Sequence, residues 1–88
     1  MADLYIASCV VRLRPEHMAV ALRQIEAITG SGVSVSNPIG KVVIVIEGKS
    51  TGALLHQMDE VREIPGVLNV EMVYQHAEDE SVMKELLQ

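Results

Sequence analysis

The sequence predicts an α+β fold in which one four-stranded antiparallel sheet carries two helices on one face. Segments with the two-residue period of strands alternate with segments of helical spacing in the order βαββαβ along the 88 residues. Phe and Trp are absent and Tyr occurs twice, while apolar residues make up 49% of the chain, so the core must be aliphatic. Aliphatic and β-branched packing is typical of a sheet with helices laid upon it.

The first strand is predicted over residues 4–13, which are apolar on both faces and therefore suit the middle of a sheet. Arg14-Pro15 ends it, because proline is favoured at the first helical position and a glutamate follows in the first turn. The helix is expected to run to about Ile28, and Gly30-Ser31-Gly32 to stop it. Its apolar stripe consists of Met18, Ala21, Leu22, Ile25 and Ile28.

A hairpin is predicted next. Residues 33–37 alternate valine and serine and form its first, short strand. Asn37-Pro38-Ile39-Gly40 is a turn, and residues 41–48, with a β-branched run in the middle, form the strand that returns.

The second helix is expected to begin at a cap made by Ser50 or Thr51 and to end before Pro65-Gly66. Its apolar stripe consists of Leu54, Leu55, Met58, Val61 and Ile64. The last strand, residues 67–76, alternates apolar and polar residues until Val73 places an apolar side chain among the polar ones.

These elements follow the ferredoxin-like pattern, in which the first and third strands are central and the second and fourth are edges. Residues 1–76 are therefore predicted to form one domain. Residues 77–88 form an acidic C-terminal tail that could be a marginal helix.

With both helices on one side, the other face of the sheet is left open. The two-residue period assigns to the helix-covered face Tyr5, Ala7, Cys9, Val11, Leu13, Val33, Val35, Val42, Ile44, Ile46, Leu68, Val70, Met72 and Tyr74. It assigns to the open face Ile6, Ser8, Val10, Arg12, Ser34, Ser36, Lys41, Val43, Val45, Glu47, Asn69, Glu71, Val73 and Gln75. An aliphatic centre with a polar rim is typical of a binding patch, and a solvated or self-associating face is the alternative.

Composition excludes several classes of function. A net charge of -5 argues against nucleic acid and anionic membrane as partners. The longest apolar run, residues 42–46, is too short to cross a bilayer, and the N-terminus lacks a positively charged leader, so we expect a cytoplasmic protein. Cys9 is the only cysteine and is expected in the core. No catalytic or metal-binding spacing surrounds the three histidines, which predicts surface positions for His17, His56 and His76, with no enzyme activity and no cofactor.

Four segments resemble the NapD family: Ile6-Ala-Ser-Cys-Val-Val-Arg, Gly32-Val-Ser-Val, Lys41-Val-Val-Ile-Val-Ile-Glu and Gly66-Val-Leu-Asn-Val-Glu-Met-Val-Tyr-Gln-His. The resemblance spans residues 4–76 and implies a cytoplasmic, ferredoxin-like maturation chaperone. Such a chaperone binds the twin-arginine signal peptide of the catalytic subunit of the periplasmic nitrate reductase. It delays export until the molybdenum cofactor and the iron-sulfur cluster have been inserted, and is itself neither an enzyme nor a cofactor carrier.

A twin-arginine peptide combines two arginines with an apolar segment, which suits the open face chemically. The face assignment predicts as peptide-binding residues Ile6, Ser8, Val10, Arg12, Val43, Val45, Glu47, Glu71 and Val73. Glu47 and Glu71 are expected to recognise the arginine pair. Two alternatives are an amino-acid-binding regulatory module that uses Gly30 and Gly32 at a dimer interface, and a dimerisation module that uses the open face against a second copy.

Overall fold

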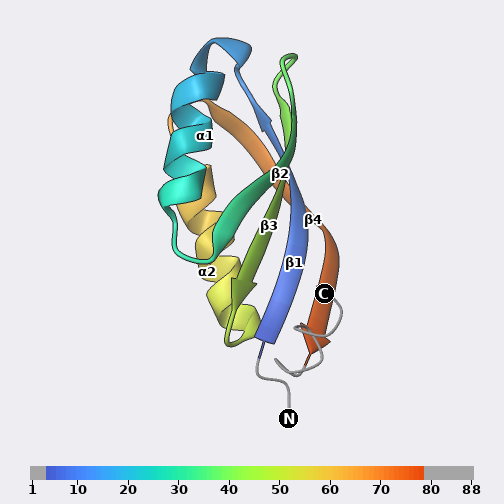
Figure 1. Ribbon diagram of the computed structural model, residues 1–88. Helices are drawn as coiled ribbons and strands as arrows, with labels where there is room; N and C mark the ends of the chain where they lie inside the picture. Colours follow the sequence, from blue (N-terminus) through green and yellow to red (C-terminus); the bar gives the residue numbers. More distant parts are fainter. Residues whose placement is uncertain (1–3, 79–88) are drawn as a thin grey trace.

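The computed structural model describes residues 4–78, the last two by their backbone alone, and confirms the βαββαβ order (Figure 1). The elements are β1 (Leu4–Leu13), a 3-10 turn η1 (Pro15–His17), α1 (Met18–Ala27), β2 (Ser31–Asn37), β3 (Lys41–Gly48), α2 (Thr51–Arg62) and β4 (Val67–Glu78). The predicted tail lies outside the described residues from residue 79 onward, whereas residues 77 and 78 continue β4.

The four strands form one antiparallel sheet in the order β2-β3-β1-β4, so the prediction that the first and third strands are central is confirmed. Both helices lie on the same side of this sheet (Figure 1). α1 packs mainly on β2, and α2 packs on β3 and β4. One face of the sheet is therefore covered by helices, and the other has no helix on it within residues 4–78.

The ends of the helices differ slightly from the predicted ones. Of the two candidate caps, Ser50 is used, because its Oγ accepts a hydrogen bond of 3.1 Å from the backbone N–H of Ala53. α2 ends at Arg62, two residues before Ile64, in agreement with the reluctance of a residue that precedes proline to remain helical. Pro15 begins a 3-10 turn, and the α-helix itself starts only at Met18.

The core lies between the helices and the covered face. It consists of Ala7, Cys9, Val11, Leu13, Ala21, Ile25, Val42, Ile44, Ile46, Leu54, Met58, Val61, Ile64 and Val70. Cys9 is buried there as predicted, and burial raises the pKa of its thiol, with Arg62 acting to a lesser extent in the opposite direction. Leu55, which was predicted on the apolar stripe of α2, is instead 51% exposed.

A buried glutamine joins the second helix to the start of β2 and the end of β3. The Nε2 of Gln57 donates to the carbonyl of Thr29 at 3.2 Å and to the carbonyl of Glu47 at 2.8 Å. Gly30 lies beside them with φ +85°, and its own carbonyl accepts from the N–H of Glu47 at 2.8 Å. A Cβ on Gly30 would collide with the carbonyl oxygen of Glu47 and with the amide of Gln57. β2 begins at Ser31, two residues earlier than predicted. Of the three residues predicted to stop the first helix, Gly30, Ser31 and Gly32, only Gly30 therefore lies in the turn.

We expect Gly30→Ala to lower the free energy of unfolding by about 1 to 3 kcal/mol, because it combines a left-handed backbone with a collision against β3. Gly32→Ala is the matched control, since nothing lies within 4 Å of a Cβ at Gly32. That control should stay within about 0.5 kcal/mol of the parent. Urea unfolding of the three proteins measures both values, and equal midpoints for the two variants would contradict the role assigned to Gly30.

Candidate functional site

The candidate site is the open face, defined as the side of the sheet turned away from α1 and α2. Directly paired residues of neighbouring strands share a face. On β1, the open face is formed by Ile6, Ser8, Val10 and Arg12. Their partners on β3 are Glu47, Val45, Val43 and Lys41, and their partners on β4 are His76, Tyr74, Glu71 and Asn69. The structure thus places eight of the nine predicted peptide-binding residues on one face, and Val73 joins them through a bulge.

The bulge in β4 changes which side chains reach the open face. Cys9 pairs with Met72 and Ser8 pairs with Tyr74, so Val73 is an extra residue without a partner of its own. Met72 packs against the core, and Val73, the next residue, therefore points to the open face, where it is 59% exposed. Beyond the bulge the alternation is shifted by one residue.

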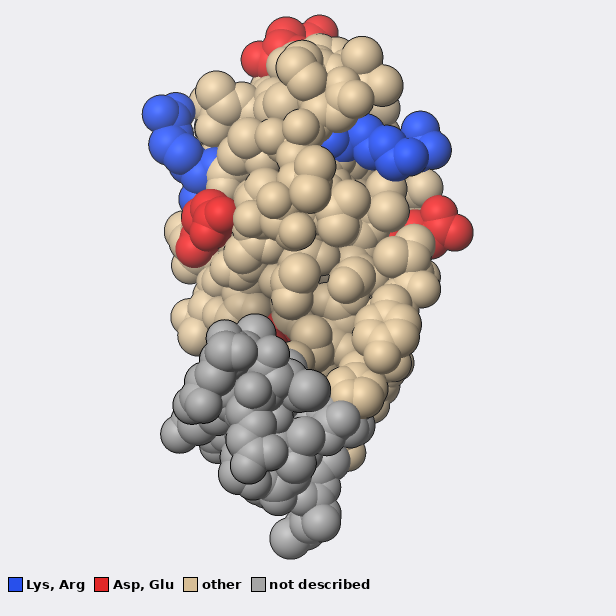
Figure 2. All heavy atoms as spheres, turned by 45° about the vertical axis from the view of Figure 1, so that its right-hand side comes forward, with Lys and Arg blue, Asp and Glu red and all other residues tan. Residues whose placement is uncertain are grey.

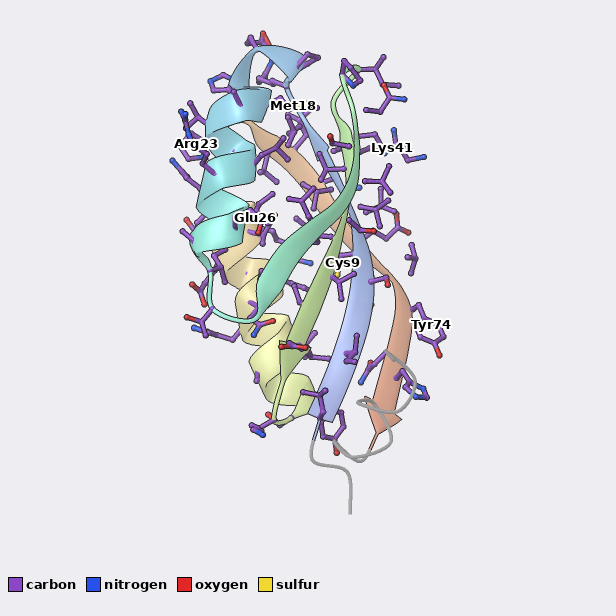
Figure 3. The ribbon with its side chains drawn as sticks, viewed as in Figure 1. Cys9, Met18, Arg23, Glu26, Lys41 and Tyr74 are labelled. Atoms are coloured by element: carbon purple, nitrogen blue, oxygen red, sulfur yellow. The ribbon has the colours of Figure 1, made fainter. Side chains whose placement is uncertain are left out.

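The predictions for Tyr74 and Gln75 are consequently wrong. Tyr74, which was predicted under the helices, lies on the open face and is 57% exposed; in Figure 3 it points away from the helices. Gln75, which was predicted on the open face, pairs with Ala7 on the covered face. There its Nε2 donates to the Oγ1 of Thr51 on α2 at 3.1 Å.

A second irregularity in β4 corrects the prediction for Leu68. Arg12 pairs with Asn69 and Leu13 pairs with Val67, which leaves Leu68 as an extra residue. Val67 packs against the core in its place, and Leu68 is 61% exposed. Leu68 therefore adds an apolar side chain to the open face instead of the covered one.

β2 contains a third bulge. Val33 pairs with Ile44 and Val35 pairs with Val43, so Ser34 is the extra residue. Val35 was predicted on the covered face but lies opposite Val43 on the open one. Ser36 was predicted on the open face but lies opposite the buried Val42.

The open face is therefore more apolar than the sequence indicated. Its apolar and aromatic side chains are Ile6, Val10, Val35, Val43, Val45, Leu68, Val73 and Tyr74. The rings of Tyr74 and His76 stack with their centroids 6.0 Å apart, and His76 is half-buried, more enclosed than the surface position predicted for it. Where it is not covered by grey atoms, Figure 2 shows this side of the molecule obliquely as largely uncharged surface, with charged side chains at its margins.

The two basic residues of the open face lie together at one end, and its two acidic residues lie apart from each other. Arg12 and Lys41 form a cross-strand pair at one end. Glu47 lies at the other end, opposite Ile6. Ile6 and Arg12 are six positions apart along β1, so the two ends are separated by about 20 Å. Glu71 lies opposite Val10 and so is nearer to the basic end. The two carboxylates predicted to recognise an arginine pair are thus well separated, on strands that flank β1 from opposite sides.

A hollow of about 380 Å³ adjoins Glu47 and is lined by Gly30, Ser31, Gly32, Val45 and Glu47. Gly32 pairs with Val45 on the open face, and the missing side chain at Gly32 leaves space beside Val45. A second hollow, of about 470 Å³, lies on the helix side of β2 between Leu22, Arg23, Glu26 and Val33. There Glu26 Oε1 accepts from the backbone N–H of Val33 at 2.9 Å and so satisfies one backbone donor of the edge strand β2.

The part of the chain that the structure describes contains no group of three or more His, Cys, Asp and Glu side chains that could hold a metal ion. Neither α1 nor α2 has the length and hydropathy needed to span a membrane. His17 and His56 are exposed as predicted. His56 approaches Glu60, one turn further along α2, at 3.3 Å.

Comparison with known proteins gives consistent matches. The model of a family described as NapD protein matches residues 4–79. The chain is 32% identical to Chaperone NapD of Escherichia coli (strain K12) over 76 residues, which cover 85% of this chain and 87% of that protein. It is 29% identical to Chaperone NapD of Haemophilus influenzae over 79 residues, which cover 89% and 84%. The solution structure of the E. coli Tat proofreading chaperone protein NapD aligns with a TM-score of 0.78 at 31% identity, covering 90% of this chain and 83% of that one.

The position of Tyr74 can be tested through stability. We expect Tyr74→Ala to lower the free energy of unfolding by less than about 1 kcal/mol, because the side chain is largely exposed and loses mainly its stacking on His76. Val70→Ala, on the covered face of the same strand, should cost about 2 kcal/mol. If Tyr74→Ala cost about 3 kcal/mol or more, as for a buried aromatic ring, the bulge at Val73 would be absent in solution.

Proposed function

Because the chain belongs to the NapD family of chaperones, we propose that it binds the twin-arginine signal peptide of the catalytic subunit of a periplasmic nitrate reductase. The bound peptide is withheld from export in the cytoplasm until the cofactors of the reductase have been inserted. A related protein described as a Tat proofreading chaperone supports this role. The function is one of binding and release and requires no catalytic group.

The observation that supports this proposal best is the apolar open face. Val45 is 37% exposed, Val73 59% and Tyr74 57%, although apolar side chains of this size are normally covered when they lie next to one another. Val45 lies on β3, and Val73 and Tyr74 lie on β4. β1, between these strands, adds Ile6 and Val10 to the same surface. The apolar segment of a signal peptide is a chemically suitable cover for it, because burying such surface is favourable and does not depend on direction.

The centre of the face is also built on well-paired strands. Val10 and Val43 are paired with each other in the two central strands, which are bonded on both sides. A preorganised surface loses little conformational entropy on binding, so more of the gain from apolar contact remains as affinity. The aliphatic side chains make few directional contacts, and discrimination between peptides is therefore left to the charged residues at the margins.

The amino-acid-binding alternative is weaker in this structure. It relied on Gly30 and Gly32 as loop glycines, but Gly30 is required for the close approach to the carbonyl of Glu47. Gly32 lies within β2. A second copy of the chain on the open face is the remaining competitor, and it predicts a change of oligomeric state without peptide.

Val45→Glu should weaken binding of a synthetic twin-arginine signal peptide at least about tenfold, because it places a charge in the apolar centre of the face. Isothermal titration calorimetry measures the change. Leu55→Glu is the matched control: the same charge replaces an exposed leucine on α2, on the helix side of the molecule, and should leave the affinity unchanged. Equal affinities for the parent and both folded variants would show that the peptide does not bind to the open face.

A further inference from the structure

We propose that the open face fixes the direction of the bound peptide. The arginine pair lies at the end formed by Gly32, Val45 and Glu47, with one guanidinium in the hollow beside Glu47. The apolar segment crosses the centre of the sheet, and the residues that follow it lie toward Arg12 and Lys41. This inference rests on the proposed function, since it concerns the same peptide on the same surface.

The hollow has the shape and chemistry that an arginine side chain needs. Its floor includes Val45, and it stays open because Gly32, the cross-strand partner of Val45, has no side chain. The carboxylate of Glu47 lies at its margin. Arginine combines an apolar stem, which can lie on valine, with a planar, weakly hydrated guanidinium that can bind a carboxylate through two parallel hydrogen bonds.

Glu47 is held in place from both sides of its backbone. Its N–H donates to the carbonyl of Gly30 at 2.8 Å, and its carbonyl accepts from Gln57 Nε2 at 2.8 Å. The side chain therefore starts from a fixed point at the end of β3. Among the residues that the structure describes, its carboxylate makes no hydrogen bond or ion pair, so it is available to an incoming cation.

The opposite end of the face disfavours an arginine pair. Arg12 and Lys41 already lie opposite each other there, and further positive charge would be repelled. Glu71 is diagonal to Arg12 across β1 and β4, so its negative charge is partly offset. Of the two predicted carboxylates, Glu47 is thus the one placed to receive arginine. The two ends lie about 20 Å apart, which a helical segment spans in about 13 residues and an extended one in about six.

Paramagnetic broadening in NMR spectra of the ¹⁵N-labelled full chain tests this direction. One synthetic signal peptide carries a nitroxide just before the arginines, and a second carries it after the apolar segment. The first should broaden the amides of Gly32, Val45 and Glu47, and the second those of Arg12 and Lys41. A reversed pattern, or equal broadening of both ends by both peptides, would overturn the inference while the proposed function stands. Absence of any binding would overturn both together.

Three variants test the hollow itself. Glu47→Gln should weaken the twin-arginine peptide about threefold or more and remove the preference over a twin-lysine peptide. Glu71→Gln should weaken the twin-arginine peptide less than Glu47→Gln does and keep the preference. Gly32→Val should fold normally, because its side chain enters open space in a strand, yet weaken binding by filling the hollow.

Two results would exclude this arrangement. Equal losses for Glu47→Gln and Glu71→Gln would show that the hollow is not the arginine site. Amide shifts on the open face that depend on protein concentration, without peptide, would assign the face to a second copy of the chain.

Discussion

The open face exists because both crossover helices pack on the same side of the sheet. β1 and β2 run parallel with β3 between them, and β3 and β4 run parallel with β1 between them, so each helix returns the chain across one intervening strand. Crossovers of this kind are right-handed, and two of them in this order place both helices on one face. Every second residue of the central strands is then turned away from the core. Those positions contain Ile6, Val10, Val43 and Val45, so the arrangement that builds the core also builds an apolar surface opposite it.

The edge strands enlarge that surface through their bulges. Each extra residue reverses the alternation beyond it, and the reversals bring Val35, Leu68 and Tyr74 to the open face. Bulges also bend and twist the strands that contain them, which discourages the pairing of an exposed edge with another chain. On β2 the carboxylate of Glu26 adds to this protection by accepting from the N–H of Val33. These features make strand addition at the edges less favourable while the face remains accessible, which favours binding across the sheet over extension of it.

The central strands could be predicted from sequence, and the edges only in part. For β1 and β3 the two-residue period is enforced by a partner on each side, and every face assignment made there agrees with the structure. An edge strand has a partner on one side only and can accept an extra residue, so alternation alone gave the wrong face for Val35, Leu68 and Tyr74. Val73, apolar in a polar position, was the one visible signal of a bulge. No sequence pattern predicts the hydrogen bonds from Gln57 to the carbonyls of Thr29 and Glu47. They join residues 28 and 10 positions apart, which only the folded chain brings together.

The buried amide of Gln57 makes the candidate arginine site depend on the packing of α2. A glutamine among aliphatic side chains is costly, and its Oε1 has no hydrogen-bond partner among the described residues. Its Nε2, however, donates to two carbonyls, one in the turn before β2 and one at the end of β3, beside the bond from the N–H of Glu47 to the carbonyl of Gly30. An aliphatic residue of similar size would fill the same space but leave both carbonyls without this donor, while the pairing with β1 and the bond to Gly30 would still hold the end of β3. Glu47 would then lose one of the contacts that fix its backbone at the margin of the hollow. Under the proposed function, a change at Gln57 would affect both stability and recognition at this end of the sheet, whereas changes at the exposed valines of the apolar centre would affect recognition with little effect on the core.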